Sequence, residues 1–283
     1  MIKWKKIGLI VNPKDFQLDW WSTYGMDPCS LYLKGDLYRV FFCGRDNQNI
    51  SKIGYVDIDL KKRSIKNISK KPVLTPGSLG SFDDNGVTAS CLVKNKKEVY
   101  LYYIGWKPKS TTRYSLMTGL AISKDNGKSF RRYSKAPILN LTDKEPYSIL
   151  TAPFVLKDKK NSWLMWYVSC NKWKNENYPI YDIKFASSKN GIDWYQSGKS
   201  IIKLKKGERA IARPYVFKEN KTYKMYYCFE KKVGDYRIGY AESKTGLHWT
   251  RKDYLSGIKK SKNKSEWDSE MIAYPHIIFH KNK

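Results

Sequence analysis

The stretch Tyr-Lys-Met-Tyr-Tyr at residues 223–227 has three counterparts earlier in the chain. They are Tyr-Arg-Val-Phe-Phe at 38–42, Tyr-Leu-Tyr-Tyr at 100–103 and Trp-Leu-Met-Trp-Tyr at 163–167. The last aromatic residues of these stretches, Phe42, Tyr103, Tyr167 and Tyr227, follow one another at intervals of about 60 residues. A fixed period of this length indicates a repeat architecture, which decides how every other motif is interpreted.

Three further series keep the same period. Downstream of the aromatic stretches lie Ile-Gly-Tyr-Val (53–56), Thr-Gly-Leu-Ala (118–121), Ile-Lys-Phe-Ala (183–186) and Ile-Gly-Tyr-Ala (238–241), and then Pro-Val-Leu (72–74), Pro-Ile-Leu (137–139) and Ser-Ile-Ile (200–202). Upstream lie Asp-Pro-Cys-Ser-Leu (27–31), Thr-Ala-Ser-Cys-Leu-Val (88–93), Thr-Ala-Pro-Phe-Val-Leu (151–156), Ala-Arg-Pro-Tyr-Val-Phe (212–217) and Ala-Tyr-Pro-His-Ile-Ile (273–278). Each period therefore contains four short β-like runs.

Four antiparallel strands per repeat form the blade of a β-propeller. Because the upstream series occurs five times, the sequence predicts an all-β, five-bladed propeller that occupies residues 1–283 as one domain. A β-sandwich is the alternative. No aromatic stretch follows residues 273–278, which predicts an incomplete last blade with exposed edge strands and reduced stability. The run Ile7–Val11 has the pattern of an outermost strand, and we expect it to complete and close that blade.

The composition is that of a globular chain with a strongly basic surface. Hydrophobic residues make up 41% and aromatic residues 15%, which excludes a disordered chain, and the formal net charge is +28. Such a charge favours an acidic partner through long-range attraction, or it reflects a lysine-rich surface alone. The basic residues are scattered and match no nucleic-acid-binding motif, so we expect no nucleic-acid partner.

Five cysteines without a C-x-x-C pair predict neither a disulfide framework nor a zinc site. His248, His276 and His280 also lack metal-site spacing, so no metal and no other cofactor is expected. No apolar stretch has the length of a membrane span, and the apolar part of the N-terminus is too short for a signal peptide. These features together predict a cytoplasmic protein.

The repeats resemble the five-bladed propellers of glycoside hydrolase families 43, 32, 62 and 130. The resemblance is strongest to propeller proteins named as glycosidases and encoded among bacterial polysaccharide genes. It rests on Gly-Val-Thr-Ala-Ser-Cys-Leu-Val (86–93), Tyr-Leu-Tyr-Tyr-Ile-Gly-Trp (100–106), Glu-Arg-Ala-Ile-Ala-Arg-Pro (208–214), Tyr-Arg-Ile-Gly-Tyr-Ala-Glu-Ser (236–243) and Trp-Asp-Ser-Glu-Met-Ile-Ala-Tyr-Pro (267–275). It covers essentially the whole chain, is specific for architecture, and implies a sugar or glycan site where the innermost strands surround a central axis.

The resemblance to families 43 and 32 implies that Asp27, at the start of the first inner strand, is the general base or the nucleophile. The alternative is that Asp27-Pro28 is only a turn that begins a strand. Family 43 carries its general acid two residues before the proline of the fourth inner strand, where this chain has Ala212. Since glycoside hydrolysis needs two carboxyl groups, Glu208 and Glu270 become the candidate acids.

Other polar and aromatic residues near the inner strands are candidates for contacts with the substrate. Arg213 suits a carboxylate or phosphate, since its guanidinium binds such groups through two hydrogen bonds. The alternative is that it pairs with Asp27 or Glu270. Asp84 is preferred over its neighbour Asp83, because adjacent side chains of an extended chain point in opposite directions. The remaining candidates are Arg45, Thr151, Tyr274, His276 and Trp106, the last either stacking on a sugar or packing internally.

The sequence therefore predicts an enzyme that hydrolyses or transfers a glycosidic bond in bacterial glycan or polysaccharide metabolism. The replacement of the family acid by Ala212, together with Arg213 and the basic charge, keeps phosphorolysis and transfer from a nucleotide sugar open. The same replacement favours a non-catalytic carbohydrate-binding propeller. A protein-interaction scaffold is the weakest alternative, because such propellers need no charged inner strands.

Overall fold

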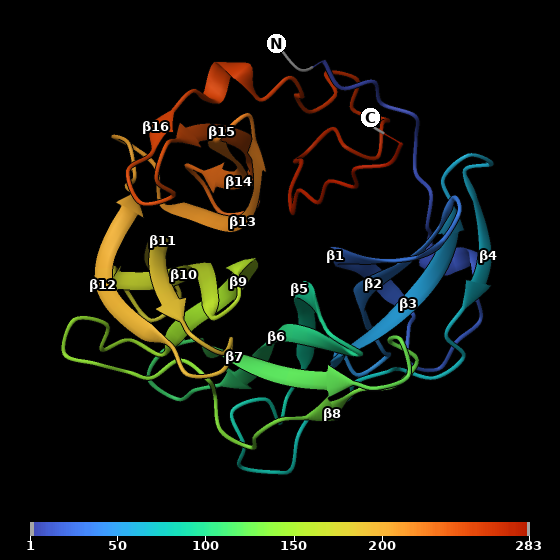
Figure 1. Ribbon diagram of the computed structural model, residues 1–283, viewed down its shortest axis with the longest axis horizontal. Coiled ribbons are helices and arrows are strands. Elements are labelled where there is room, and N and C mark those ends of the chain that lie inside the picture. The colour runs from blue at the N-terminus through green and yellow to red at the C-terminus, as the bar shows by residue number, and fades with distance from the viewer. Residues whose placement is uncertain (1–2, 282–283) are drawn as a thin grey trace. The chain divides into compact units, whose positions relative to one another are not determined.

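The computed structural model describes residues 3–281 (Figure 1). Within them the chain forms 16 strands and two helical turns, the 3-10 helices Pro13–Asp15 and Asp253–Leu255. The prediction of an all-β protein is confirmed. The described chain divides into two compact units. We call Leu9–Leu139 together with residues 276–281 the N-terminal unit, and residues 3–8 together with Asn140–Pro275 the C-terminal unit.

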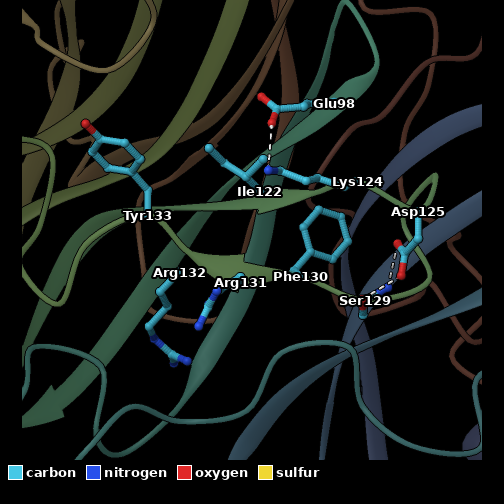
Figure 2. A pocket seen from close by; sticks show the side chains of 9 residues that line it. All are labelled: Glu98, Ile122, Lys124, Asp125, Ser129, Phe130, Arg131, Arg132 and Tyr133. Atoms are coloured by element: carbon cyan, nitrogen blue, oxygen red, sulfur yellow. Dashed lines mark hydrogen bonds and ion pairs between the residues drawn. The ribbon is translucent and has the colours of Figure 1, made fainter.

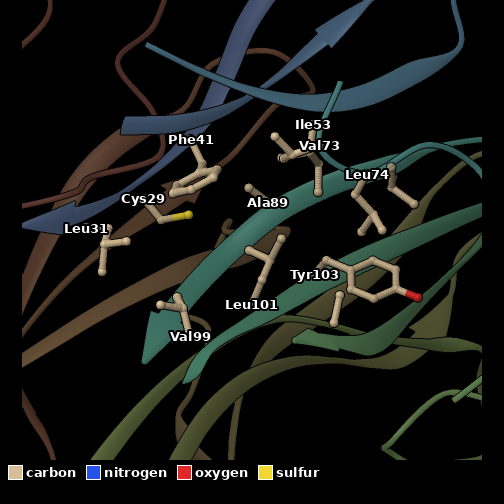
Figure 3. Close-up of a cluster of buried hydrophobic side chains, with 12 residues drawn as sticks. Cys29, Leu31, Phe41, Ile53, Val73, Leu74, Ala89, Val99, Leu101 and Tyr103 are labelled. Atoms are coloured by element: carbon tan, nitrogen blue, oxygen red, sulfur yellow. The ribbon is translucent and has the colours of Figure 1, made fainter. Parts of the chain in front are cut away.

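The N-terminal unit holds the first two sequence repeats. Strands β1 (Thr23–Lys34), β2 (Leu37–Arg45), β3 (Ser51–Asp59) and β4 (Ser64–Ile68) form an antiparallel sheet in chain order. Strands β5 (Val87–Asn95), β6 (Glu98–Pro108), β7 (Tyr114–Ser123) and β8 (Arg131–Arg132) also pair consecutively and antiparallel. Their alternating apolar residues meet in one buried cluster that includes Cys29, Phe41, Ile53, Leu101 and Tyr103 (Figure 3).

The C-terminal unit repeats this pattern twice. Strands β9 (Ile149–Lys159), β10 (Ser162–Trp173), β11 (Pro179–Ser188) and β12 (Tyr195–Ile202) pair consecutively and antiparallel. Strands β13 (Ala210–Glu219), β14 (Thr222–Glu230), β15 (Arg237–Ser243) and β16 (Thr250–Arg251) do the same. The two groups are joined by a parallel bridge between Tyr181 and Ala210.

The first three predicted strands of each of these four repeats are present, and the predicted segment 200–202 of the third repeat forms the end of β12, but the fourth strands of the first two repeats are placed differently. In the first two repeats the last strand, β4 or β8, precedes the predicted Pro-Val-Leu and Pro-Ile-Leu segments. Those segments add only local contacts, an isolated bridge from Leu74 to Ile53 and a hydrogen bond from Ile138 N to Thr118 O. Proline lacks an N–H group for the strand ladder, which explains why these segments do not extend the sheet.

Two predictions about the last repeat are wrong. The run Ile7–Val11 forms no strand, and neither does Ala273–Ile278. Ile7 and Leu9 are instead 53% and 54% exposed, and Gly8 between them has a φ of +108°. A strand requires a hydrogen-bonding neighbour, and residues 256–281 contain no strand to provide one. The sequence pattern was repeated there without the pairing that would turn it into a sheet.

Candidate functional site

Three inner strands carry the same local distortion, a β-bulge at an X-Pro step. In β1, Met26 pairs with Cys43 and Cys29 with Phe41, so that Asp27-Pro28 faces Phe42 alone. Ala152-Pro153 faces Tyr167 and Arg213-Pro214 faces Tyr227 in the same way. We call this feature the X-Pro bulge. Bulges bend a strand and re-aim a side chain, and they are common beside active sites.

The first residue of each X-Pro bulge has a left-handed backbone. The φ values are +57° at Asp27, +47° at Ala152 and +52° at Arg213, and Tyr274-Pro275 in the fifth repeat follows with +58° at Tyr274. This conformation is unfavourable for residues other than glycine, and such residues concentrate at functional sites. Three residues predicted as site residues, Asp27, Arg213 and Tyr274, thus share one strained position in the repeat.

In the N-terminal unit, Asp27 is buried. His276 also lies in this unit, where its Nε2 is 2.7 Å from Ser30 Oγ of the same strand as Asp27. Arg45, at the end of β2, lies with its guanidinium carbon 4.6 Å from the ring centroid of Tyr24 and donates to Asn49 Oδ1 at 2.9 Å. The ring and the amide therefore fix the direction of the Arg45 side chain.

Asp84 and Trp106 have contacts that tie them to their own surroundings. Asp84 Oδ2 accepts hydrogen bonds from Gly80 N at 2.8 Å and from Lys107 Nζ at 3.1 Å. Its neighbour Asp83 is buried and accepts hydrogen bonds from Tyr103 and Arg132, and both aspartates lie in a turn and not in an extended strand. The Trp106 ring lies 5.2 Å from that of Tyr114, centroid to centroid. These contacts favour a loop-stabilising role for Asp84 and a packing role for Trp106.

Arg213 and Tyr274 meet in the C-terminal unit. Arg213 is 7% exposed, and its guanidinium carbon lies 5.8 Å from the ring centroid of Tyr274. The Tyr274 ring is 6.1 Å from that of Tyr236, whose hydroxyl lies 2.7 Å from the hydroxyl of Tyr181. Burial, followed by the neighbouring Tyr181 and Tyr274, raises the pKa of Tyr236 well above its ordinary value, so this phenol keeps its proton. A guanidinium beside phenol groups is rich in hydrogen-bond donors, which suits an anion.

The hydroxyl of Thr151 is buried without a hydrogen-bond partner. The residue is 5% exposed, and its Oγ1 finds no partner among the described residues. Thr88 in β5 is 2% exposed and its Oγ1 is in the same state. An unmade buried hydrogen bond costs about 1–3 kcal/mol, so it calls for an explanation such as a bound ligand or water. Thr88 was missed in the sequence, although the shared Thr-Ala step at 88–89 and 151–152 marks it.

The two candidate acids differ in their surroundings. Glu208 is buried and accepts hydrogen bonds from Arg251 Nη1 at 2.7 Å and from Arg251 Nη2 at 2.9 Å. Glu270 is exposed, and only its main-chain carbonyl takes part in the hydrogen bonds recorded for it, from Arg237 and Lys260. Both catalytic assignments stay predictions, and the contacts of Glu208 favour a structural role.

A surface hollow of about 570 Å³ lies beside β7 and β8 (Figure 2). Lys124 faces Glu98 across it, and Asp125 is bonded to Ser129 at its edge (Figure 2). Similar hollows of about 540 and 490 Å³ occupy the corresponding turns of the next two repeats. Since the hollow recurs wherever this hairpin turn occurs, it follows from the shape of the repeat and does not mark the site.

Within residues 3–281, no three His, Cys, Asp or Glu side chains are grouped as a metal site. None of the helices in this part of the chain has the length and apolar character needed to cross a membrane.

Comparison with known protein families assigns the chain. The model of the "Glycosyl hydrolases family 32 N-terminal domain" matches residues 27–206, well over half of the chain, and the match begins at Asp27. The chain belongs to glycosyl hydrolase family 32. The resemblance recognised in the sequence is thereby confirmed, and the chain is assigned to a family of carbohydrate-active enzymes that act on glycosidic bonds.

Relatives of this family 32 chain include an uncharacterized protein of Mycobacterium tuberculosis. The two are 35% identical over 99% of this chain and 92% of the relative. A solved glycoside hydrolase superposes with a TM-score of 0.71 at 17% identity, covering 95% of this chain and 86% of the other. The sucrose-6-phosphate hydrolase from Lactobacillus gasseri gives 0.60 at 12% identity, covering 80% and 47%. The structural likenesses show a propeller glycosidase fold.

Proposed function

We propose that this protein cleaves or transfers a glycosidic bond, with Asp27 as the general base or nucleophile. The observation that supports the proposal is the buried carboxyl side chain of Asp27 at the X-Pro bulge of the first repeat, where the family 32 match begins. The same bulge occurs at Ala152, so the bulge belongs to the repeat, and Asp27 is the bulge residue that brings a carboxyl group to this position.

Glycosidic cleavage requires a second carboxyl group to protonate the leaving oxygen. Glu208 is occupied by two hydrogen bonds from Arg251 and is not our choice for this role. We propose Glu270, which is exposed and able to exchange protons with solvent. Its variant Glu270→Gln should lose turnover but keep sugar binding.

We further propose that the repeats are the blades of a single five-bladed propeller over residues 1–283, with four strands in each complete blade. The consecutive antiparallel pairing in four repeats supports this architecture, and residues 256–281 would belong to the fifth blade. The five buried free cysteines support a cytoplasmic location.

The substrate that we propose is a bacterial sugar or glycan that carries an anionic group such as a phosphate. Arg213, beside the Tyr274 phenol, would bind that group, and the net charge of +28 would attract it. Thr151 and His276 would bind sugar hydroxyls, and the constrained guanidinium of Arg45 would contact the ligand at the edge of β2.

A non-catalytic sugar-binding protein is the second candidate, because Ala212 stands where family 43 carries its acid. Turnover of sucrose and of sucrose 6-phosphate separates the two, measured by release of hexose from wild-type protein and from Asp27→Asn. We expect turnover by the wild type and none by the variant, with binding retained in calorimetry. Binding without turnover by the wild type would establish the second candidate, and equal turnover by Asp27→Asn would refute the role of Asp27.

A further inference from the structure

Opposite each bulge in the strand register lies the last aromatic residue of the neighbouring strand, and this residue is the centre of a buried cluster. We call this cluster the floor of the repeat. In the second repeat, Tyr103 donates to Asp83 Oδ2 at 2.9 Å, and Arg132 Nε donates to the same atom at 2.8 Å. In the third repeat, Tyr167 donates a hydrogen bond to Glu145 Oε2 at 2.8 Å, and Gln196 Nε2 donates to the same atom at 3.1 Å.

The fourth floor contains Glu208. Arg251 donates to both oxygens of Glu208 and, at 3.0 Å, to Asp253 Oδ2, while Tyr227 donates to Asp253 Oδ1. Glu208 thus occupies the place that Asp83 and Glu145 have in their repeats, about 20 residues before the floor tyrosine. Glu208 therefore has the same structural role as its counterparts Asp83 and Glu145.

The first floor has no charge at all. Phe42 replaces the tyrosine, Trp21 packs on it with ring centroids 4.5 Å apart, and Ile68 joins the same apolar cluster. Apolar side chains thus stand in this floor where the other floors have polar and charged ones. This floor lies opposite Asp27 in the strand register.

The floors differ in the charged side chains that they hold. The second and third floors, opposite Ala89 and Ala152 in the strand register, each pair one carboxylate with one cation, Arg132 or Lys184. The fourth floor, opposite Arg213, holds two carboxylates, Glu208 and Asp253, and two cations, the buried Arg251 and the exposed Lys205. Its charges therefore balance, and Tyr227 is joined through Asp253 to a network of four charged side chains.

We propose that Tyr227, Glu208, Arg251 and Asp253 are positioning residues, which hold the bulge so that Arg213 binds the anionic group of the substrate. The inference rests on the proposed function, in which Arg213 contacts that group. Tyr227 faces Arg213-Pro214 in the strand register and is fully buried, so its hydrogen bond to Asp253 holds in place the strand with which the bulge is paired.

The test compares Tyr227→Phe with Tyr103→Phe. Both variants lose one buried phenol–carboxylate hydrogen bond, but only Tyr227 faces a charged bulge residue in the strand register. Calorimetric titration with sucrose 6-phosphate and with sucrose is made on both. We expect Tyr227→Phe to weaken binding of sucrose 6-phosphate about tenfold without changing that of sucrose. Tyr103→Phe should change neither, although both variants should melt at a lower temperature.

Two further variants distinguish positioning from general loss of structure. In the Arg213→Ala background, Tyr227→Phe should have no additional effect on sucrose 6-phosphate, because the bond acts through Arg213. Asp253→Asn keeps an acceptor for Tyr227 but removes the ion pair with Arg251, and it should shift affinity in the same direction as Tyr227→Phe.

The inference is overturned if Tyr227→Phe and Tyr103→Phe bind sucrose 6-phosphate alike, or if Tyr227→Phe weakens both ligands equally. It is also overturned if wild-type protein and Arg213→Ala bind sucrose 6-phosphate equally. Failure of the enzyme proposal would give another result. Wild-type protein would then turn over neither sugar, but Tyr227→Phe would still weaken the binding of sucrose 6-phosphate.

Discussion

Asp27 has a left-handed backbone at the bulge, and such strain costs on the order of 1–3 kcal/mol. We expect Asp27→Gly to raise the free energy of unfolding by about 1 kcal/mol, after the entropic penalty of glycine, and to abolish turnover. Urea denaturation measures the first effect and hexose release the second. Ala152→Gly at the matching bulge should stabilise similarly with turnover retained. A destabilised Asp27→Gly variant would show that the position is not strained.

The buried hydroxyl of Thr151 leads to a second prediction about a single residue. Thr151→Val keeps the shape of the side chain and removes the unpaired oxygen, so we expect it to raise unfolding stability by up to about 1 kcal/mol. The same variant should weaken binding of sucrose in calorimetry, while Thr151→Ser should retain it. If stability fell instead, the hydroxyl would have a structural partner and its role in binding sugar would lose its support.

At the scale of elements, the third repeat balances its floor differently from the second and fourth. Gly119 and Gly239 lie so close to the floor tyrosines that an added Cβ would fall 2.3 Å from the Tyr103 and Tyr227 rings. The third repeat has Lys184 in this position, with Nζ 3.7 Å from Glu145, and Gln196 where the other two repeats have Arg132 and Arg251. In the third repeat the cation is therefore on the third strand, β11, whereas in the second and fourth repeats it is on the fourth strand, β8 or β16.

Lys184→Gly should therefore destabilise the protein by about 3 kcal/mol, because it leaves Glu145 buried without a cation. Adding Gln196→Arg to Lys184→Gly should recover most of that loss by recreating the arrangement of the second repeat. Urea denaturation of the single and double variants measures both effects. Additive losses in the double variant would contradict the exchange of cations between the two positions.

The same elements show what could be read from the sequence. The first three strands of each repeat were predicted because long alternating runs around Phe42, Tyr103, Tyr167 and Tyr227 repeat at one spacing. The two-residue strands β8 and β16 hold no such alternation, and the expected strand at Ile7–Val11 has no partner. The sequence could show that Asp27 and Arg213 share one position in the repeat, because each directly precedes a proline. It could not show the floors, because each floor joins residues that are far apart in the sequence.

At the scale of the whole molecule, the net charge of +28 should govern the approach of an anionic substrate. Raising sodium chloride from about 20 mM to about 500 mM shortens the Debye length several-fold, so we expect the KM for sucrose 6-phosphate to rise. The KM for sucrose should stay constant over the same range, and steady-state kinetics measures both. An equal response of the two sugars would show that the basic surface has no part in recognition.

The two arrangements of the floor constrain the history of the repeats. If the third repeat descends from an ancestor like the second, two substitutions separate them, glycine to the present Lys184 and arginine to the present Gln196. Taking arginine away first would have left Glu145 without a cation inside the protein, whereas gaining the lysine first kept it paired throughout. That descent would favour gaining the lysine first, and a related repeat that carries both cations is the intermediate to look for.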